Sequence, residues 1–282
     1  MHWLLRDRRV LLRRPFVLGI VNVTPDSFSD GGLYFGVHAA ADHAERLLDE
    51  GADGVDLGGE STRPNNPGPV PEAEEIARVA PVVREVRRRR PDAIVSVDTV
   101  KGAVARAALD EGADAINDVS GLRLDADVGA ACAAVGAGLI LMHSRGAVAD
   151  MATFTHAEYG DDVVGEVVEE LEGALTRAAD SGVPAECIVL DPGVGFAKRS
   201  EHSIEVLREL RRLAALGRPL LVGASRKRFV GELSDVADPA GRVHGSVGAH
   251  VAALAGGARL FRVHDVRAHR EALDVAWAVL RG

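Results

Sequence analysis

Cysteine is nearly absent from this sequence of 282 residues. Only Cys132 and Cys187 occur, which is too few for a disulfide framework or for a cysteine-based metal cluster. Both lie in apolar stretches predicted to be helix or strand. A chain without a disulfide framework is typical of a reducing compartment, so we expect a cytoplasmic protein.

The sequence also lacks an excess of positive charge and any long apolar run. Its formal net charge is -9, and this sign disfavours nucleic acid or an anionic membrane as a partner, because both attract basic surfaces. No stretch approaches the roughly 20 apolar residues of a membrane span. We therefore expect neither nucleic acid nor a membrane as a partner, and any anionic ligand must be met by local cationic groups.

The N-terminal segment, residues 1–14, is basic and partly apolar. Its arginines interrupt every apolar run, and it has no small-residue cleavage site, so it does not have the pattern of a signal peptide. We interpret it as a short β-hairpin that turns near Asp7. Such a hairpin would lead into the first strand of a barrel and could plug one end of it.

The rest of the chain has no linker that would divide it. Hydrophobic residues make up 47% of the sequence and charged residues 27%, an ordinary globular composition with ample material for a core. The length alone would allow two domains, but α/β barrels of this size commonly form one. We predict a single domain over residues 1–282.

Residues 16–32 show the pattern that the remaining chain repeats. The apolar run from Phe16 to Thr24 is typical of a strand covered on both faces, as in a parallel sheet. It leads into Pro25-Asp-Ser-Phe-Ser-Asp-Gly-Gly32, whose polar side chains and glycine pair are typical of an active-site loop. A second polar loop, residues 60–68, is too rich in proline and glycine for helix or sheet and has the composition of a mobile lid.

Seven further apolar runs end in the same way, with helical spacing between them. Strands are predicted near residues 54–59, 93–99, 115–121, 138–144, 187–193, 219–225 and 258–264. Helices are predicted over residues 37–51, 71–90, 101–112, 200–217, 242–256 and 265–281, with one more ending near 136 and another before 187. Eight strands alternating with helices predict a TIM (β/α)8 barrel, and a doubly wound open sheet is the alternative.

Polar side chains at the ends of the strands should meet at one mouth of such a barrel. Asp98, Asn117 and Asp191 each end a strand. Carboxylate acceptors together with an amide suit a flat heterocycle rich in hydrogen-bond donors, such as a pterin. A single strand-terminal Asp or Asn is more often a helix cap, but three together favour a ligand.

Cationic groups follow the last two strands. In barrels these strand ends are the usual site for phosphate, so Ser225-Arg-Lys227 and Arg262-Val-His264 indicate an anionic substrate. Arg262 and His264 alternate around one valine and therefore share a side of the strand, where an inward-facing arginine needs an anionic partner. For Arg228, ordinary surface charge explains the residue equally well.

Two other strand ends carry weaker signals. Asn22 could offer its amide oxygen to a hard cation, but one neutral ligand holds Mg²⁺ only when substrate phosphates and water complete the shell. His143 alone is more often a structural histidine than a catalyst. Met142 could form a wall for an aromatic substrate.

Together these motifs resemble the dihydropteroate synthase family. The likeness rests on residues 22–32, 58–64, 96–98, 116–118, 191–196, 225–227 and 262–264, which occur in family order over nearly the whole chain. It implies the joining of p-aminobenzoate to 6-hydroxymethyl-7,8-dihydropterin diphosphate, with release of diphosphate, in folate biosynthesis. It also implies a homodimer, a requirement for Mg²⁺ and a target for sulfonamides.

The resemblance further implies roles for single residues. Asp98, Asn117, Asp191 and Lys227 would hold the pterin, Arg262 and His264 the diphosphate, and Asn22 the Mg²⁺. Phe28, Asp30, Thr62 and Arg63 belong to the two polar loops, and Met142, Phe196 and Val263 complete the predicted binding site. The predicted catalytic residues are Asp30, Lys227, Arg262 and His264. Some family members carry serine at the position of Arg228, next to the predicted p-aminobenzoate rim.

No nucleophilic Ser or Cys is positioned for a covalent intermediate, so we expect direct transfer. Carbon–oxygen cleavage would come first, with Mg²⁺, Arg262 and His264 stabilising the departing diphosphate and Asp30 the carbocation-like centre. The aniline nitrogen then attacks. The alternatives are a pterin-dependent corrinoid methyltransferase, which would not need Arg262 and His264, and a non-catalytic pterin-binding paralogue, which we would expect to have lost loop residues or a cation.

Overall fold

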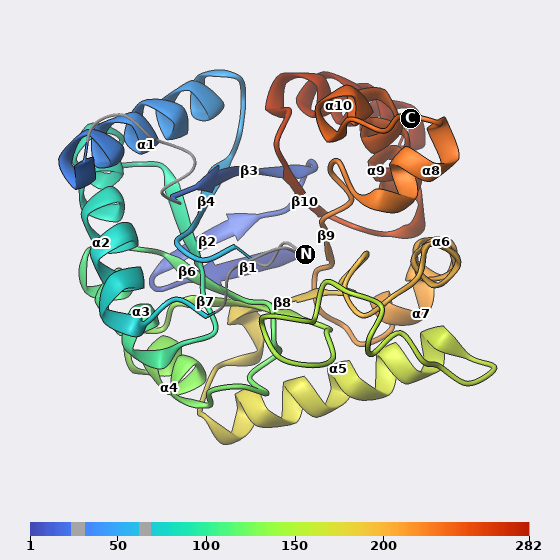
Figure 1. Cartoon of the computed structure of the whole chain (residues 1–282), viewed down its shortest axis with the longest axis horizontal. Coiled ribbons are helices and arrows are strands. Elements are labelled where there is room, and N and C mark those ends of the chain that lie inside the picture. The colour runs from blue at the N-terminus through green and yellow to red at the C-terminus, as the bar shows by residue number, and fades with distance from the viewer. Residues whose placement is uncertain (24–31, 62–68, 282) are drawn as a thin grey trace.

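Parallel strands form a barrel surrounded by helices in this computed structural model, which describes residues 1–23, 32–61 and 69–281 (Figure 1). The eight strands of the described sheet are β3 (Phe16–Asn22), β4 (Gly54–Gly58), β5 (Ile94–Asp98), β6 (Ala115–Asp118), β7 (Gly138–Met142), β8 (Ile188–Asp191), β9 (Leu221–Val222) and β10 (Leu260–Val263). Neighbours pair in chain order from β3 to β8, and β10 lies between β3 and β9. A bridge from Leu190 to Leu220 joins β8 to the segment before β9. The TIM barrel is confirmed.

The helices alternate with these strands as predicted. They are α1 (Gly32–Asp49), α2 (Glu72–Arg89), α3 (Gly102–Asp110), α4 (Asp127–Val135), α5 (Val163–Asp180), α6 (Ser200–Arg208), α7 (Leu210–Ala214), α8 (Arg228–Ser234), α9 (Val243–Gly256) and α10 (Val266–Arg281), with the short turns η2 (Ala185–Cys187) and η3 (Pro239–Arg242). The helix predicted over residues 200–217 is divided, because Glu209 leaves helical geometry at φ -106° and ψ 23°. The seven-residue α8 was not predicted, since it is too short to show helical periodicity.

Alternation along each strand divides its apolar side chains between two cores. Val17 and Val21 of β3 pack outward in the large cluster that joins the strands to the helices. Phe16 and Leu18 of the same strand pack inside the barrel with residues such as Ile140. Successive strand side chains point to opposite faces, so an unbroken apolar run is needed to fill both cores.

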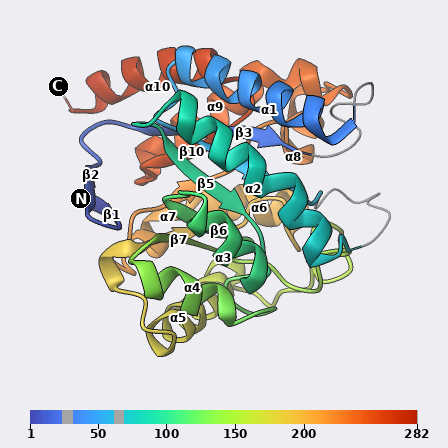
Figure 2. The same cartoon turned by 90° about the vertical axis from the view of Figure 1, so that its left-hand side faces the viewer.

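An N-terminal hairpin closes one end of the barrel, as the sequence predicts. Strands β1 (His2–Leu5) and β2 (Arg8–Leu11) pair antiparallel, and they lie at the end of the barrel opposite α8 (Figure 2). Trp3 is fully buried in the interior cluster, and its indole N–H donates a hydrogen bond to the carbonyl of Cys187 at 2.8 Å. The other end, where the strands terminate in polar residues, is therefore the one left for a ligand.

The helices were also compared with the requirements of a membrane span. Within the described ranges, none of them combines the length and the apolarity needed to cross a bilayer.

Candidate active site

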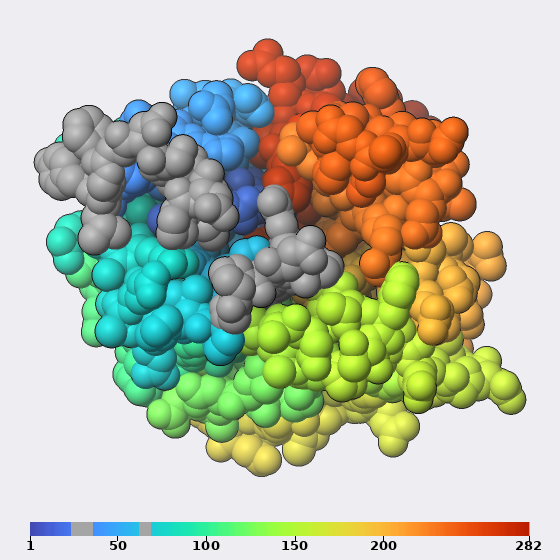
Figure 3. Space-filling model, in the orientation of Figure 1, coloured from blue at the N-terminus to red at the C-terminus, as the bar shows by residue number. Residues whose placement is uncertain are grey.

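A cavity of about 420 Å³ lies at the carboxyl ends of the barrel strands. In the space-filling view, the segment after β7 and helix α8 lie on the face of the molecule that carries this end of the barrel (Figure 3). Nine of the residues singled out from the sequence line it: Asn22, Asp98, Asn117, Met142, Asp191, Phe196, Lys227, Arg262 and His264. The fold thus brings together residues that lie up to about 240 positions apart in the sequence.

Five predicted residues are not among those that line the cavity. Phe28, Asp30, Thr62 and Arg63 lie outside the described residues. Val263 is fully buried in the core between the strands and the helices, so its side chain faces away from the cavity. The predicted substrate contact of Val263 stays a prediction, and it would have to be made by the backbone. The alternation that turns Arg262 inward necessarily turns its neighbour outward.

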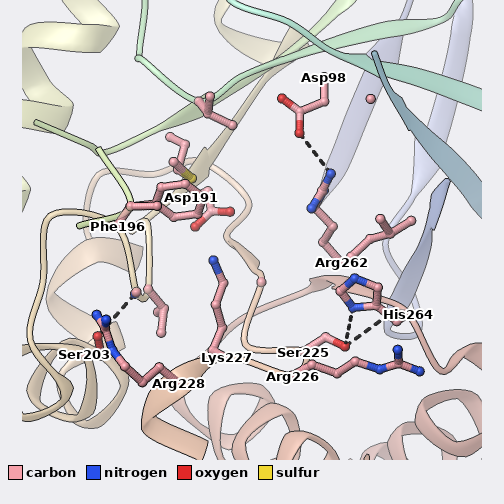
Figure 4. Close-up of a pocket in the computed structure, with 18 of the residues that line it drawn as sticks. Asp98, Asp191, Phe196, Ser203, Ser225, Arg226, Lys227, Arg228, Arg262 and His264 are labelled. Carbon is pink, nitrogen blue, oxygen red and sulfur yellow. Dashed lines mark hydrogen bonds and ion pairs between the residues drawn. The ribbon is translucent and has the colours of Figure 1, made fainter. Parts of the chain in front are cut away.

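Arg262 bridges two carboxylates inside the barrel, and Figure 4 shows its contact with one of them, Asp98. Its Nε lies 2.6 Å from Oδ2 of Asp56, and a terminal nitrogen lies 2.9 Å from Oδ2 of Asp98. Burial raises the pKa of Asp98 to about 7, while the guanidinium of Arg262 opposes this rise. The inward-facing arginine therefore has the anionic partners that its burial requires.

Asp56 was missed by the sequence analysis. It is fully buried on β4, and its Oδ2 also accepts a hydrogen bond from the Asn117 amide at 3.0 Å. Its signal was present, because a lone acid stands in the middle of the apolar run of residues 54–59. Oδ1 of Asp56 and Oδ1 of Asn117 are buried and have no hydrogen-bond partner among the described residues. Both unpaired atoms are acceptors, which suits a ligand that supplies N–H donors.

Asp191 and Lys227 face each other across the cavity (Figure 4). Burial raises the pKa of Asp191 to about 6, and a hydrogen bond at 2.7 Å from the backbone N–H of Gly193 opposes the rise. Burial, followed by the neighbouring Arg262, lowers the pKa of Lys227 to about 8. The ammonium of Lys227 also lies 3.9 Å from the centre of the Phe196 ring, a cation–π contact.

The turn after β9 is held by several partners. The hydroxyl of Ser225 lies 3.0 Å from Nδ1 of His264 and accepts a hydrogen bond from the backbone N–H of the same histidine. Arg226 adopts a left-handed φ of 59° and binds both oxygens of Asp265. Non-glycine residues rarely adopt this conformation, so the turn depends on such contacts. It places Lys227 in the cavity.

The rim of the cavity combines a cationic side chain with an apolar wall. Arg228 lines the cavity, and its guanidinium lies 3.8 Å from the centre of the Phe154 ring, so this residue is more than surface charge. Met142 and Phe196 belong to an apolar cluster with Val119 and Met151, which gives one wall a surface suited to an aromatic ring. Within the described ranges, no group of three or more His, Cys, Asp or Glu side chains is placed to hold a metal ion.

Comparison with known proteins places this geometry in a family. A family model described as pterin binding enzyme matches residues 18–264. The dihydropteroate synthase of Synechocystis sp. is 43% identical over 269 residues, covering 95% of this chain and 91% of that protein. The dihydropteroate synthase of Neisseria meningitidis serogroup C is 44% identical over 272 residues, covering 95% and 94%.

Solved structures agree with the sequence comparisons. Xanthomonas albilineans dihydropteroate synthase with 4-aminobenzoic acid matches with a TM-score of 0.90 at 44% identity, covering 99% of this chain and 97% of that chain. The Thermus thermophilus dihydropteroate synthase in complex with 6HMPPP matches with a TM-score of 0.84 at 46% identity, covering 99% and 100%. This chain therefore belongs to the dihydropteroate synthase family of pterin-binding enzymes.

Proposed function

We propose that the chain joins p-aminobenzoate to 6-hydroxymethyl-7,8-dihydropterin diphosphate, forming 7,8-dihydropteroate and releasing diphosphate. The observation that carries this proposal is the meeting of two kinds of group in one cavity. The acceptors Asp98, Asn117 and Asp191 lie beside the cationic side chains Lys227 and Arg262. The first set suits a donor-rich ring and the second an anion.

The pterin would occupy the acceptor side of the cavity. Asp191 and the unpaired Oδ1 of Asn117 can accept from its amino and ring N–H groups. Met142 and Phe196 would lie against its apolar faces. A related complex supports a pterin as the ligand, because the Xanthomonas albilineans enzyme has been solved with 7,8-dihydropteroate and matches this chain with a TM-score of 0.87.

We assign the diphosphate to Arg262 and His264 at the end of β10. Asn22 ends β3 and lines the same cavity, so its amide oxygen can serve as one ligand of Mg²⁺, with phosphate oxygens and water as the others. When bound, Mg²⁺ would supply positive charge to the phosphate oxygens. The cationic side chains of the protein add to that charge from fixed positions.

The reaction then needs little covalent participation from the protein. The bond between the pterin methylene carbon and oxygen breaks, and its electron pair leaves with the diphosphate. Arg262 and His264 stabilise the charge that accumulates on this leaving group. The aniline nitrogen forms the new bond to the methylene carbon and loses a proton. We assign Asp30 to the stabilisation of the electron-poor carbon.

We also propose that the protein is a cytoplasmic homodimer. Helix α10 exposes three apolar side chains, with Val275 67%, Val279 76% and Leu280 52% exposed. It lies beside α9 (Figure 1), whose composition is apolar around most of its circumference. Such a surface is typical of an interface between subunits. Sedimentation of Val279→Glu, which should be monomeric if this surface pairs two copies, tests the assignment.

A turnover assay tests the enzymatic proposal directly. Purified protein with both substrates and Mg²⁺ should release diphosphate and form dihydropteroate, detected by mass spectrometry, and Asp191→Asn serves as the impaired control. Binding of a bare pterin without any product would identify a non-catalytic paralogue. Methyl transfer from a methylated pterin to a corrinoid acceptor would instead identify a methyltransferase. Either result would replace the proposed function.

A further inference from the structure

Lysine is rare in this chain, and its positions are informative. Only three of the 33 lysine and arginine residues are lysines: Lys101, Lys198 and Lys227. Lys198 and Lys227 both line the cavity. Arginine remains charged under all ordinary conditions, whereas a buried lysine can lose its proton. The reaction described above uses Lys227 and leaves Lys198 without a role.

Lys198 is buried with its ammonium fully engaged. Its side chain is among the largest that are fully buried in the protein. Nζ lies 2.6 Å from Nδ1 of His143, and it donates to the carbonyls of Gly193 at 3.2 Å and Phe196 at 3.3 Å. Three partners match the three donors of an ammonium group. Lys198 thereby joins the end of β7 to the loop that follows β8.

The histidine extends this contact to an acid on α5. Oε2 of Glu170 lies 3.1 Å from Nε2 of His143, a close electrostatic contact without the alignment of a hydrogen bond. Burial, followed by the neighbouring Lys198, lowers the pKa of His143 to about 4, so the imidazole is neutral at pH 7. With Nδ1 facing the ammonium, the ring proton belongs on Nε2, toward Glu170. We call this arrangement of Lys198, His143 and Glu170 the lysine linkage.

The loop held by Lys198 has an unusual backbone. Residues 193, 195 and 197 all have left-handed φ angles, of 67° for Gly193, 79° for Gly195 and 45° for Ala197. A side chain on Gly193 would place its Cβ 1.8 Å from the carbonyl oxygen of His143, so only glycine fits there. Ala197 has no such freedom and adopts a strained conformation directly before Lys198. A conformation of this kind persists only where its surroundings fix it, and Lys198 binds two carbonyls of the loop.

The same loop shapes the pterin side of the cavity. The N–H of Gly193 donates to Asp191, and the Phe196 ring lies beneath the ammonium of Lys227. The charged and titratable groups that face Lys198 are Asp191, Glu170, Arg145, Lys227 and His143. Its positive charge, after those of Lys227 and Arg262, helps to keep Asp191 ionised. Burial lowers the pKa of Lys198 to about 7, so this support is present in acid and is lost as the pH rises.

We propose that Lys198 is a positioning residue of the pterin pocket, in which the lysine linkage fixes loop 192–197 and keeps Asp191 ionised for the ligand. The inference rests on the proposed function, because it concerns the same cavity. Although Lys198 borders the cavity, its Nζ is engaged by His143 and by two loop carbonyls, so it acts on the ligand through the loop and through Asp191. It is therefore expected to govern pterin affinity and to leave the p-aminobenzoate side unaffected.

The test compares Lys198→Met with Arg270→Met in the complete protein. Arg270 is a matched control, since it is also a buried cation but binds Asp53 and the carbonyl of Pro15 away from the cavity. Lys198→Met should raise the Kd of a bare pterin and the KM of the pterin substrate by about tenfold, the effect of one lost charge-assisted interaction. The KM of p-aminobenzoate should stay within about twofold of its normal value. Arg270→Met should lower only the thermal midpoint.

The pH profile separates a positioning role from a structural one. Loss of the Lys198 charge should raise the pKa of Asp191, so the acid limb of pterin binding should move to higher pH in Lys198→Met. Glu170→Gln leaves the cavity wall intact and should move the alkaline limb to lower pH, because the ammonium loses an anionic neighbour. This second variant tests the proposal even where Lys198→Met folds poorly.

Labelling lysine with ¹³C at Cε offers a direct spectroscopic readout. With three lysines in the sequence, the spectrum should contain three signals, and the one missing from Lys198→Met identifies Lys198. That signal should titrate near neutral pH in the wild type, at lower pH in Glu170→Gln, and should shift when a bare pterin binds. Unchanged KM values and pH profiles in both variants would overturn the proposal. Absence of turnover by wild-type protein would defeat the proposed function alone, since bare-pterin binding and the lysine signal would still test the linkage.

Discussion

Arg262→Ala removes a guanidinium that bridges the buried carboxylate of Asp56 and the partly buried carboxylate of Asp98. Removing one partner of a buried ion pair costs about 3–5 kcal/mol, because the remaining charge is left without compensation. The Arg262 side chain is 22% exposed, so we expect the lower end of this range, about 3 kcal/mol. In a domain of this size, that loss lowers the thermal midpoint by about 6–12 °C.

The stability lost in Arg262→Ala should depend on pH. Without the guanidinium, the pKa of Asp98, already raised by burial to about 7, rises further. A carboxyl group whose pKa is higher in the folded than in the unfolded state lowers the free energy of unfolding as the pH rises from the unfolded-state pKa to the folded-state pKa. Because the folded-state pKa of Asp98 is higher in the variant, its decline continues after that of the wild type has ended. The midpoint difference between wild type and Arg262→Ala should therefore grow from about pH 6 to about pH 8.

The same substitution should weaken the binding of both the bare pterin and the pterin diphosphate. Sequence reasoning alone expects Arg262→Ala to damage use of the pterin diphosphate far more than binding of the bare pterin. The ion pair with Asp98 predicts in addition that the affinity for the bare pterin falls about tenfold, because a more protonated Asp98 is a poorer hydrogen-bond acceptor. The affinity for the pterin diphosphate should fall further. Calorimetry measures the affinities for the two ligands, and thermal unfolding measures the stability. Arg262→Ala combined with Asp56→Asn should recover part of the stability, because it removes the excess buried charge. Wild-type stability and bare-pterin affinity in Arg262→Ala would refute the reasoning.

Further outcomes follow from other parts of the molecule. Asp191→Asn should weaken bare-pterin binding by about 1.5–3 kcal/mol in calorimetry, and unchanged affinity would reduce Asp191 to a cap. Wild-type affinity for a bare pterin should fall by up to about tenfold per pH unit below pH 6, because burial raises the pKa of Asp191 to about 6 and its anion accepts the hydrogen bonds; a flat profile would argue against this. Trp3→Ala should cost about 3–5 kcal/mol of stability in thermal unfolding with both KM values unchanged, unless the two ends of the barrel are coupled. A sulfonamide should bind about 1–3 kcal/mol more tightly when Mg²⁺, diphosphate and a pterin are present, and equal affinity in their absence would show a preformed second site.

The barrel was predictable because its strands carry the information locally. Continuous apolar runs, filling two cores at once, appear in the sequence without reference to any other segment. The hairpin was predictable from its short length and its arginines. The division of the helix at residue 209 and the existence of α8 depend on tertiary packing, which periodicity does not show.

The site was predictable where residues end strands and hidden where they do not. Asp98, Asn117 and Asp191 stand at the expected positions. Asp56 sits within a strand, and its partner Arg262 is 206 residues away in the sequence. The proposed role of Lys198 depends on the left-handed turn at Ala197, and this conformation cannot be predicted from an alanine in the sequence.

The hairpin that covers the N-terminal end of the barrel also gives the protein a useful optical property. The sequence holds two tryptophans, and they occupy contrasting environments. Trp3 is sealed within the barrel and bonded to a carbonyl 184 residues away, whereas Trp277 lies near the guanidinium groups of Arg259 and Arg281. In Trp277→Phe, all indole emission would come from Trp3. The emission spectrum of Trp3 would then change from that of a solvent-exposed indole to that of a buried one. The rate of this change would measure how fast the N-terminal end of the barrel closes during refolding.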